Sequence, residues 1–475
     1  MTPRTRVVLA VVLAAGLAPA GVRAQPAVFL ESESLLAARR WAPGFAHERD
    51  IEQCRASADL SDYCRRLLVP FYEYLTLHAE NFGVRGLSVE FAGWGVVDLA
   101  DRFDPTKAAR VPQKENGNSP GVGGDVLVGT ASYRSRDGKL ELRLGRQFLF
   151  LGAPYSTNFD GLFARYTFPY DFSLAVYGGG ATPRDAEAGR DALNPMFGGR
   201  LAWSRLDRGG LGLAYLEEMT TSGELVRRQA GVDAFAVLPK HIELYGSALF
   251  DVAEIEGVPK VEEATLVASW MPTPRLKLAL DYTYIVPAAL ISKNSIFSVF
   301  SDSNYHDAGL DAYFRVTPRL KLSAQLKARA FSDGEQGWLG GVGGRYLLGE
   351  SWRQVVGVDL QRLFSKNDNL ERSGYYQARL YGSVEPVTRL YLTADLYYFH
   401  FDGAVWGPNA QTTGASAVRD AGSLSVIAGY RISPTMDTLL SLTANFNPAS
   451  RYETIFLGRF VWHTWLESKP QKVQP

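Results

Sequence analysis

The sequence predicts an all-β protein, a transmembrane antiparallel up-and-down β-barrel of about 20 strands, with 18 to 22 as the range. Three observations predict it. Apolar and polar residues alternate in run after run from residue 86 to residue 465, as in RLKLALDYTY (275–284). Short and long connections alternate between these runs. After residue 25 no stretch of 18 apolar residues occurs, so only a closed barrel would satisfy its backbone in lipid.

The composition excludes several classes of function. The 475-residue chain has 50 basic and 50 acidic residues, so no positive excess favours nucleic-acid binding. Mean hydropathy is −0.10, which suits a chain that spreads its apolar residues over many half-exposed strands. No CxxCH haem motif, P-loop or ordered catalytic triad is present, so we expect no cofactor, no metal site and no enzyme activity.

The N-terminus has the pattern of an export signal. A basic start, an apolar stretch and Val22-Arg23-Ala24 predict a signal peptide at 1–24. Residues 25–85 follow as a short helical or irregular segment, periplasmic or inside the barrel as a plug. Cys54 and Cys64 lie ten residues apart in an exported chain, which predicts a local disulfide.

The barrel itself is expected at 86–465, followed by a periplasmic tail at 466–475. The predicted strands are 86–99, 124–135, 138–148, 160–168, 171–179, 196–206, 210–219, 224–238, 240–252, 258–272, 275–286, 306–317, 319–331, 336–349, 352–364, 370–385, 388–401, 420–432, 435–446 and 450–465. The segment 72–82 could add another strand.

The connections set the orientation of the predicted barrel. Tight turns such as 136–138 and 273–274 alternate with longer links such as 100–123 and 287–305. In outer-membrane barrels the tight turns are periplasmic. An even strand number then brings both termini to the periplasmic side of the outer membrane of a Gram-negative cell.

A propeller or a soluble sandwich is the main competing fold, but no blade-length repeat is present. Aromatic residues close several strands, among them Tyr282, Tyr284, Trp462 and Trp465, as membrane-interface girdles do. We therefore expect the leucines of 275–284 to face lipid, and Lys277 and Asp281 to face a polar lumen.

Alternation predicts further charges in the lumen, with a small basic excess that favours at most a mild preference for anions. Cross-strand pairing of these charges is the simpler interpretation. The basic residues are Lys139, Arg143, Arg200, Lys277, Arg315, Lys321, Lys327, Arg329 and Arg379, and the acidic ones are Glu141, Glu243, Asp251, Asp281, Asp311, Asp359 and Asp395.

Arg146 breaks the alternation of KLELRLGRQFLF (139–150), because it follows Leu140, Leu142 and Leu144 onto the lipid side. Either a bulge at Gly145 turns Arg146 inward, or Arg146 lies at the outer rim beside lipid phosphate. We favour the bulge.

The segment 145–166 resembles a known family. GRQ, a short loop and DGLFARY resemble the alginate-export and related specific-porin barrels, and LAVYGGG (174–180) and GGRLAW (198–203) resemble runs in delta-proteobacterial porins. The resemblance implies an outer-membrane channel, with Arg143, Arg146, Asp160, Arg165 and Arg200 lining the pore.

The predicted function is therefore a porin that passes small hydrophilic solutes, anionic ones among them, in contact with outer-membrane lipid and lipopolysaccharide. The alternatives are a barrel that encloses a periplasmic or cytochrome partner in an electron conduit, and an adhesin. An adhesin would need longer, repetitive loops.

Overall fold

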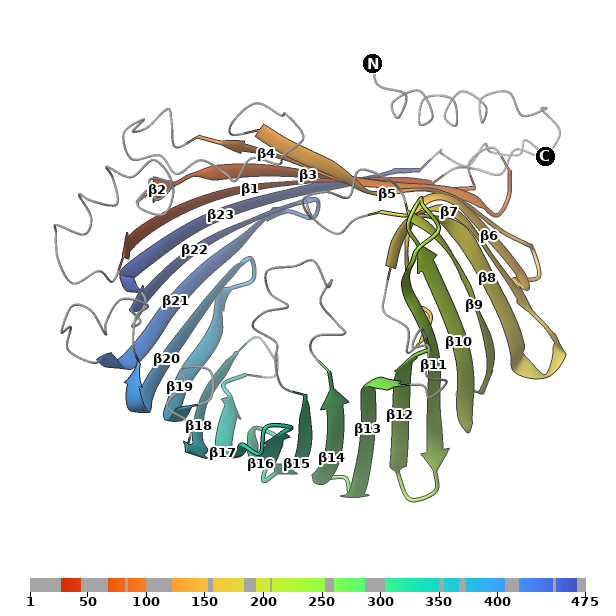
Figure 1. Ribbon diagram of the computed structural model, residues 1–475. Helices are drawn as coiled ribbons and strands as arrows, with labels where there is room; N and C mark the ends of the chain where they lie inside the picture. The colour runs from red at the N-terminus through yellow and green to blue at the C-terminus, as the bar shows by residue number, and fades with distance from the viewer. Residues whose placement is uncertain are drawn as a thin grey trace.

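The structure is a computed structural model, and it describes residues 27–43, 67–81, 84–99, 122–152, 157–182, 194–205, 207–252, 260–286, 304–349, 354–366, 373–405, 418–446 and 450–467. These residues form one antiparallel sheet arranged as a ring (Figure 1). The predicted signal peptide and the pair Cys54 and Cys64 lie outside the described residues. The disulfide therefore stays a prediction.

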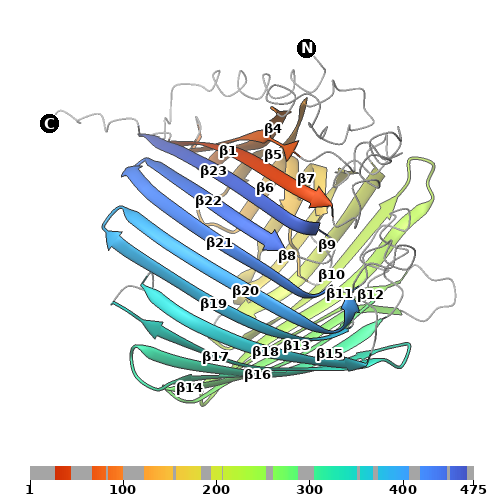
Figure 2. The same cartoon turned by 90° about the vertical axis from the view of Figure 1, so that its left-hand side faces the viewer.

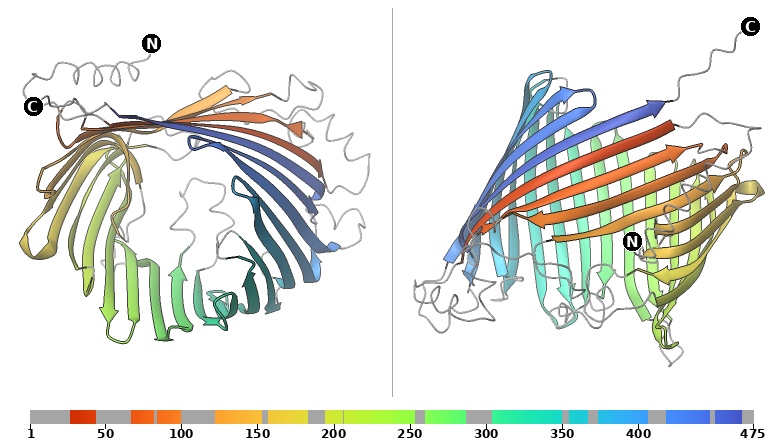
Figure 3. Two further views of the ribbon diagram at one scale, coloured as in Figure 1. Left: turned by 180° about the vertical axis from the view of Figure 1, so that it is seen from behind. Right: turned by 90° about the horizontal axis from the view of Figure 1, so that it is seen from above.

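The sheet closes on itself. From β3 onward each strand pairs with the next along the chain, and β1 pairs with both β3 and β23. Figure 3 shows β1 (red) beside β23 (blue), and Figure 2 shows the strands running obliquely along the wall. The sheet has 23 strands, but the two-residue β2 pairs only with β1, so the wall contains 22. The predicted antiparallel barrel is confirmed.

The strand bounds follow the sequence closely from residue 87 onward. The strands are β1 (Ala27–Pro43), β2 (Leu67–Leu68), β3 (Pro70–Glu80), β4 (Leu87–Asp98), β5 (Val122–Arg134), β6 (Leu140–Leu149), β7 (Thr157–Thr167), β8 (Phe172–Ala181), β9 (Asn194–Arg205), β10 (Gly209–Met219), β11 (Leu225–Leu238), β12 (Ile242–Asp251), β13 (Lys260–Thr273), β14 (Leu276–Ile285), β15 (Tyr305–Arg315), β16 (Leu320–Phe331), β17 (Gln336–Leu347), β18 (Val355–Lys366), β19 (Ser373–Val387), β20 (Leu390–Val405), β21 (Val418–Ser433), β22 (Met436–Phe446) and β23 (Ser450–Glu467). A 3₁₀ turn, η1 (Pro169–Asp171), joins β7 to β8. In the described part of the chain, no helix is long and apolar enough to cross a bilayer.

The two ends of the barrel differ in their connections, as the sequence predicts. Ala27, where β1 begins, pairs with Glu467, where β23 ends, so both lie at one end. The connections at that end are short, for example 274–275 and 388–389, and we call it the short-connection end. The opposite, long-connection end carries links such as 99–121 and 286–304.

Two expectations for the N-terminal part are corrected. The central value of 20 strands is two too low, although 22 lies within the predicted range. The helical or irregular segment expected at 25–85 is wrong for 27–43 and 70–80, which are β1 and β3. Glu, Leu, Ala and Arg in 27–43 suggested a helix, but pairing with β23 along the whole strand decides the outcome. Without β1, the backbone groups of two strand edges would have no partners.

The two faces of the wall have opposite character. On β14, Leu280 and Tyr282 point to one face and are 57% and 38% exposed. Lys277 and Asp281 point to the other. We call these the apolar face and the polar face, and the strand register continues both onto β13 and β15. On β6 to β10 the polar face also carries a buried apolar cluster that includes Phe159, Phe163 and Met196. The alternation within each strand predicted that the wall would have an apolar and a polar face. The register between strands places residues of the same kind side by side on each face.

The turn at 135–139 illustrates how the short connections form. Ser135 Oγ donates a hydrogen bond of 2.6 Å to Asp137 Oδ1, and the Leu140 N–H donates one of 2.9 Å to Ser135 Oγ. Gly138 supplies a φ of +71°, which other residues rarely adopt. The Ser135 hydroxyl and the Lys139 N–H hold the pKa of Asp137 below its ordinary value. The carboxylate therefore stays charged and fixes the turn.

Candidate functional site

A cluster around one buried carboxylate covers the polar face of β5 to β7. Glu141 is 4% exposed, and it lies between Arg134 and Arg165 in the strand register. Arg143 Nε donates to Glu141 Oε1 at 2.7 Å, and Arg165 Nη2 donates to Oε2 at 2.5 Å. Arg134 Nη2 is 3.6 Å from the same carboxylate. One carboxylate thus faces three guanidinium groups, which leaves the cluster positive.

A second ion pair crosses β9 to β11. Arg200 Nη2 donates to Asp233 Oδ1 at 2.7 Å, and Nη1 donates to the Leu151 carbonyl at 3.1 Å. The guanidinium lies over Gly212, where a Cβ would collide with it. Glycine at 212 therefore leaves the space in which this pair forms.

Further pairs follow on β14 to β20. Arg329 Nε donates to Asp307 Oδ1 at 2.6 Å, and Arg379 binds both oxygens of Asp395, with Nη2 at 2.6 Å from Oδ2. The longer pairs are Arg379–Asp359 at 3.8 Å and Lys327–Asp281 at 3.9 Å. The expectation that charges pair across strands describes these groups well.

Three basic residues form a row of like charge. Arg315 pairs with Lys321 in the register of β15 and β16, and Lys321 pairs with Arg345 of β17. Among the described residues, no carboxylate lies within ion-pair distance of these three. Like charges directly opposite one another are destabilising in a sheet. The row therefore costs stability, and its positive field is available to an anion.

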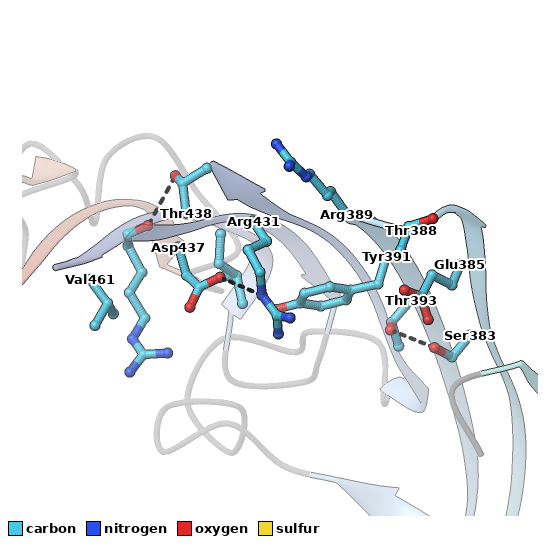
Figure 4. Close-up of a pocket in the computed structure, with 12 residues that line it drawn as sticks. Ser383, Glu385, Thr388, Arg389, Tyr391, Thr393, Arg431, Asp437, Thr438 and Val461 are labelled. Carbon is cyan, nitrogen blue, oxygen red and sulfur yellow. Dashed lines mark hydrogen bonds and ion pairs between the residues drawn. The ribbon is translucent and has the colours of Figure 1, made fainter. Parts of the chain in front are cut away.

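A pocket of about 400 Å³ lies on the polar face at the short-connection end (Figure 4). Arg431 Nε is 3.4 Å from Asp437 Oδ1, and Thr393 Oγ1 donates to Ser383 Oγ at 3.3 Å. The lining residues are Ser383, Glu385, Thr388, Arg389, Tyr391, Thr393, Arg431, Asp437, Thr438, Leu439, Arg459 and Val461. Arg459 also binds Glu33 of β1, Nε to Oε1 at 2.5 Å, so the pocket lies against the closing strand.

The other predicted residues are dispersed. Lys139 lies in the 135–139 turn, 3.9 Å from Asp137. Glu243 accepts a long hydrogen bond of 3.4 Å from Ser269 Oγ. Asp251, Asp311 and Lys277 lie opposite Gln229, Ala279 and Tyr313 in the register, and no shared site joins them.

The predicted bulge at Gly145 is wrong. The pairing of β6 with both neighbours runs through Gly145 without a register shift, so no residue is inserted there, and Gly145 has a φ of +118°. Arg146 shares the register face of Leu144, which is 61% exposed on the apolar side. Its Nε donates to Asp160 Oδ1 at 2.8 Å, and Nη1 donates to the Val126 carbonyl at 2.8 Å. The structure thus pairs Arg146 with Asp160 towards the long-connection end, as in the rim alternative.

Sequence reasoning missed the aromatic residues of the polar face. Tyr391, Tyr397, Phe399 and Phe401 recur at period two along β20, interrupted by Thr393 and Asp395. The sequence YLTADLYYFHF (391–401) shows these aromatic residues at every second position, but a search for ionisable groups does not detect uncharged rings. Glu73 was also missed: on the apolar face it accepts hydrogen bonds of 2.5 and 2.6 Å from two serine hydroxyls of β1.

No group of three His, Cys, Asp or Glu residues suited to a metal ion occurs within the described ranges.

Comparison with known protein families gives no match, and neither does comparison with the sequences of curated proteins. Among solved structures, the E. coli P pilus tip assembly intermediate PapC-PapD-PapK-PapG has a TM-score of 0.51 at 10% identity. The match covers 94% of this chain and 62% of that chain, so this chain spans less than two thirds of its length.

Two other solved structures have lower TM-scores. The P pilus usher (PapC) translocation pore gives 0.46 at 9% identity, over 92% of this chain and 99% of that chain. Acinetobacter baumannii OccAB4 gives 0.44 at 9% identity, over 94% and 100%. At such identities the likeness is one of fold.

Proposed function

We propose that this protein is an outer-membrane channel, which passes small hydrophilic solutes through a lumen lined by the polar face. The observation that carries the proposal is the division of a closed sheet into an apolar and a polar face. A closed barrel with an apolar outside satisfies its backbone groups in lipid. The start of β1 and the end of β23, which both lie at the short-connection end, are then on the periplasmic side.

The exposure of the side chains supports the choice of the polar face as the inside. Side chains diverge on the outer surface of a barrel and converge on its inner surface. The apolar side chains of Leu280 and Val342 are 57% and 61% exposed. The carboxylate side chains of Asp307 and Asp395 on the polar face are each 22% exposed. From Tyr391 to Tyr398 on β20, the residues of the apolar face are exposed and those of the polar face are half-buried, so the polar face is the more crowded one.

The width of the wall supports a solute path. Barrels of 16 to 18 strands already leave an aqueous channel. Ion pairs such as Arg379–Asp395 and Arg329–Asp307 keep these long side chains against the barrel wall, so they do not extend across the lumen.

A mild preference for anions is the finer part of the proposal. The row Arg315, Lys321 and Arg345 and the positive cluster around Glu141 support it, because basic rings favour anions in pores.

The test is single-channel recording of the purified, refolded full chain in a planar bilayer. We expect stable steps of nanosiemens scale, and a reversal potential in a salt gradient with the sign of a weakly anion-selective pore. Electrical silence from a protein whose β-content and heat-modifiable gel mobility show a folded barrel would refute the channel.

A further inference from the structure

An aromatic track follows the polar face of β19 and β20. Tyr397 and Phe399 have ring centroids 6.4 Å apart at an interplanar angle of 8°, and Phe399 and Phe401 are 6.3 Å apart at 13°. Tyr375 of β19 lies across from Phe401 in the register, with its ring centroid 5.7 Å from that of Phe399. Four rings thus form one continuous strip at the long-connection end.

The track continues towards the short-connection end. Tyr391 lies on the same register face of β20 and lines the pocket of Figure 4. Its ring occupies the space that a Cβ at Gly429 would take, and the ring of Tyr381 does the same at Gly357. Glycine at these two positions lets each ring pack against the neighbouring strand.

Polar groups separate the rings. Arg379 lies 4.5 Å from the ring centroid of Tyr381 and 4.9 Å from that of Tyr397, while both of its terminal contacts go to Asp395 and Asp359. The arginine is therefore compensated in charge. On the other side, β21 presents Ser423 and Ser425 in register with Tyr397 and Asp395, which leaves that flank small and polar.

Membrane anchoring does not account for these rings. Aromatic residues that anchor a barrel belong to the lipid-facing surface, where Tyr376 and Tyr398 lie. The track residues have the opposite register, among ion pairs and hydroxyl groups. Large half-buried rings on a hydrated wall still leave part of their apolar surface in contact with water. A ligand with apolar ring faces would remove that cost.

We propose that this track binds linear, uncharged oligosaccharides, a proposal that rests on the channel function above. A pyranose ring presents C–H groups on its faces, which stack on the electron-rich face of an aromatic ring. Its hydroxyls lie around the edge and form hydrogen bonds with carboxylates, guanidinium groups and hydroxyls. Aromatic rings alternate along the track with Arg379, Asp395 and serines. Successive sugar units would therefore meet both a ring to stack on and polar groups for their hydroxyls. Arg379 faces two carboxylates, so these three groups together carry no positive excess that would favour an anionic sugar.

The first experiment measures binding of maltohexaose, with glucose as the short comparison. In single-channel recordings of the full chain we expect reversible block by maltohexaose and much weaker block by glucose. Saturation-transfer NMR on the detergent-solubilised protein measures the same binding without conductance. Binding in NMR from a protein that conducts no ions would support the track and refute only the channel.

Matched leucine variants locate the site. Tyr397→Leu and Phe399→Leu keep apolar volume but remove a ring, and each should weaken maltohexaose binding about tenfold, which is about 1.4 kcal/mol. Tyr398→Leu makes the same change on the apolar face between them and should leave binding unchanged. Absence of oligosaccharide binding in both assays would overturn the proposal, as would equal losses in all three variants. Benzoate is a charged aromatic carboxylate and serves as the contrasting ligand. If the track bound benzoate and not maltohexaose, the proposal of an uncharged oligosaccharide would also be overturned.

Discussion

Replacing Leu280 by Lys tests which face of the wall contacts lipid. Leu280 is the fifth residue of the ten-residue strand β14, so it lies near mid-height, and its side chain is 57% exposed on the apolar face. A Lys facing lipid at the midplane of a barrel costs about 2–4 kcal/mol. A loss of about 3 kcal/mol corresponds to a roughly hundredfold change in the unfolding equilibrium.

Ala279→Lys is the matched control one residue away. Ala279 lies on the polar face, opposite Asp311 in the register, so an added ammonium there meets a carboxylate. We expect a change below about 0.5 kcal/mol, as for an ordinary exposed position. The measurement is reversible guanidinium unfolding of protein folded into phospholipid vesicles, followed by tryptophan fluorescence. An equal or larger loss from Ala279→Lys would refute the assignment of the faces.

Three further predictions test other parts of the structure. Lys321→Glu interrupts the basic row, so the reversal potential in a salt gradient should move towards cation selectivity; an unchanged potential would remove the row from the conduction path. Gly145→Ala adds a Cβ against the Gly129 carbonyl at a φ of +118°, and vesicle unfolding should show a loss of about 2–3 kcal/mol with unchanged conductance. Deleting residues 27–43 removes the strand that joins β23 to β3, so the heat-modifiable folded band should vanish from gels. Survival of the band with a larger conductance would instead indicate a plug.

The alternation of residues determined much of this fold without tertiary information. Period two in RLKLALDYTY assigns Leu280 and Asp281 to opposite faces whatever the neighbours are, because strand geometry alone requires it. The alternation of connection lengths likewise determined which ends of the strands lie together. These features are local, so a single sequence is enough to predict them.

The site depends on contacts that are distant in the sequence. Arg379 and Asp395 are 16 residues apart, Arg200 and Asp233 are 33 apart, and Arg459 and Glu33 are 426 apart. Each pair forms only when the register and the closure of the barrel are set. The sequence predicted which charged residues lie on the polar face, but it could not predict which of them would form ion pairs with an opposite charge.

The closing strand shows the same limit most clearly. By composition, 27–43 is compatible with a helix, and pairing with the edges of β3 and of β23, which lies far along the chain, makes it a strand. Gly145 is a second case, because the sequence marked a break in alternation there but gave no means to choose between a bulge and an unshifted register with a positive φ. The sequence by itself thus determined strands, faces and ends, whereas pairing between distant strands decided the closure, the ion pairs and the aromatic track. The physical reason is that alternation is a property of one strand, while backbone hydrogen bonding and charge compensation require two.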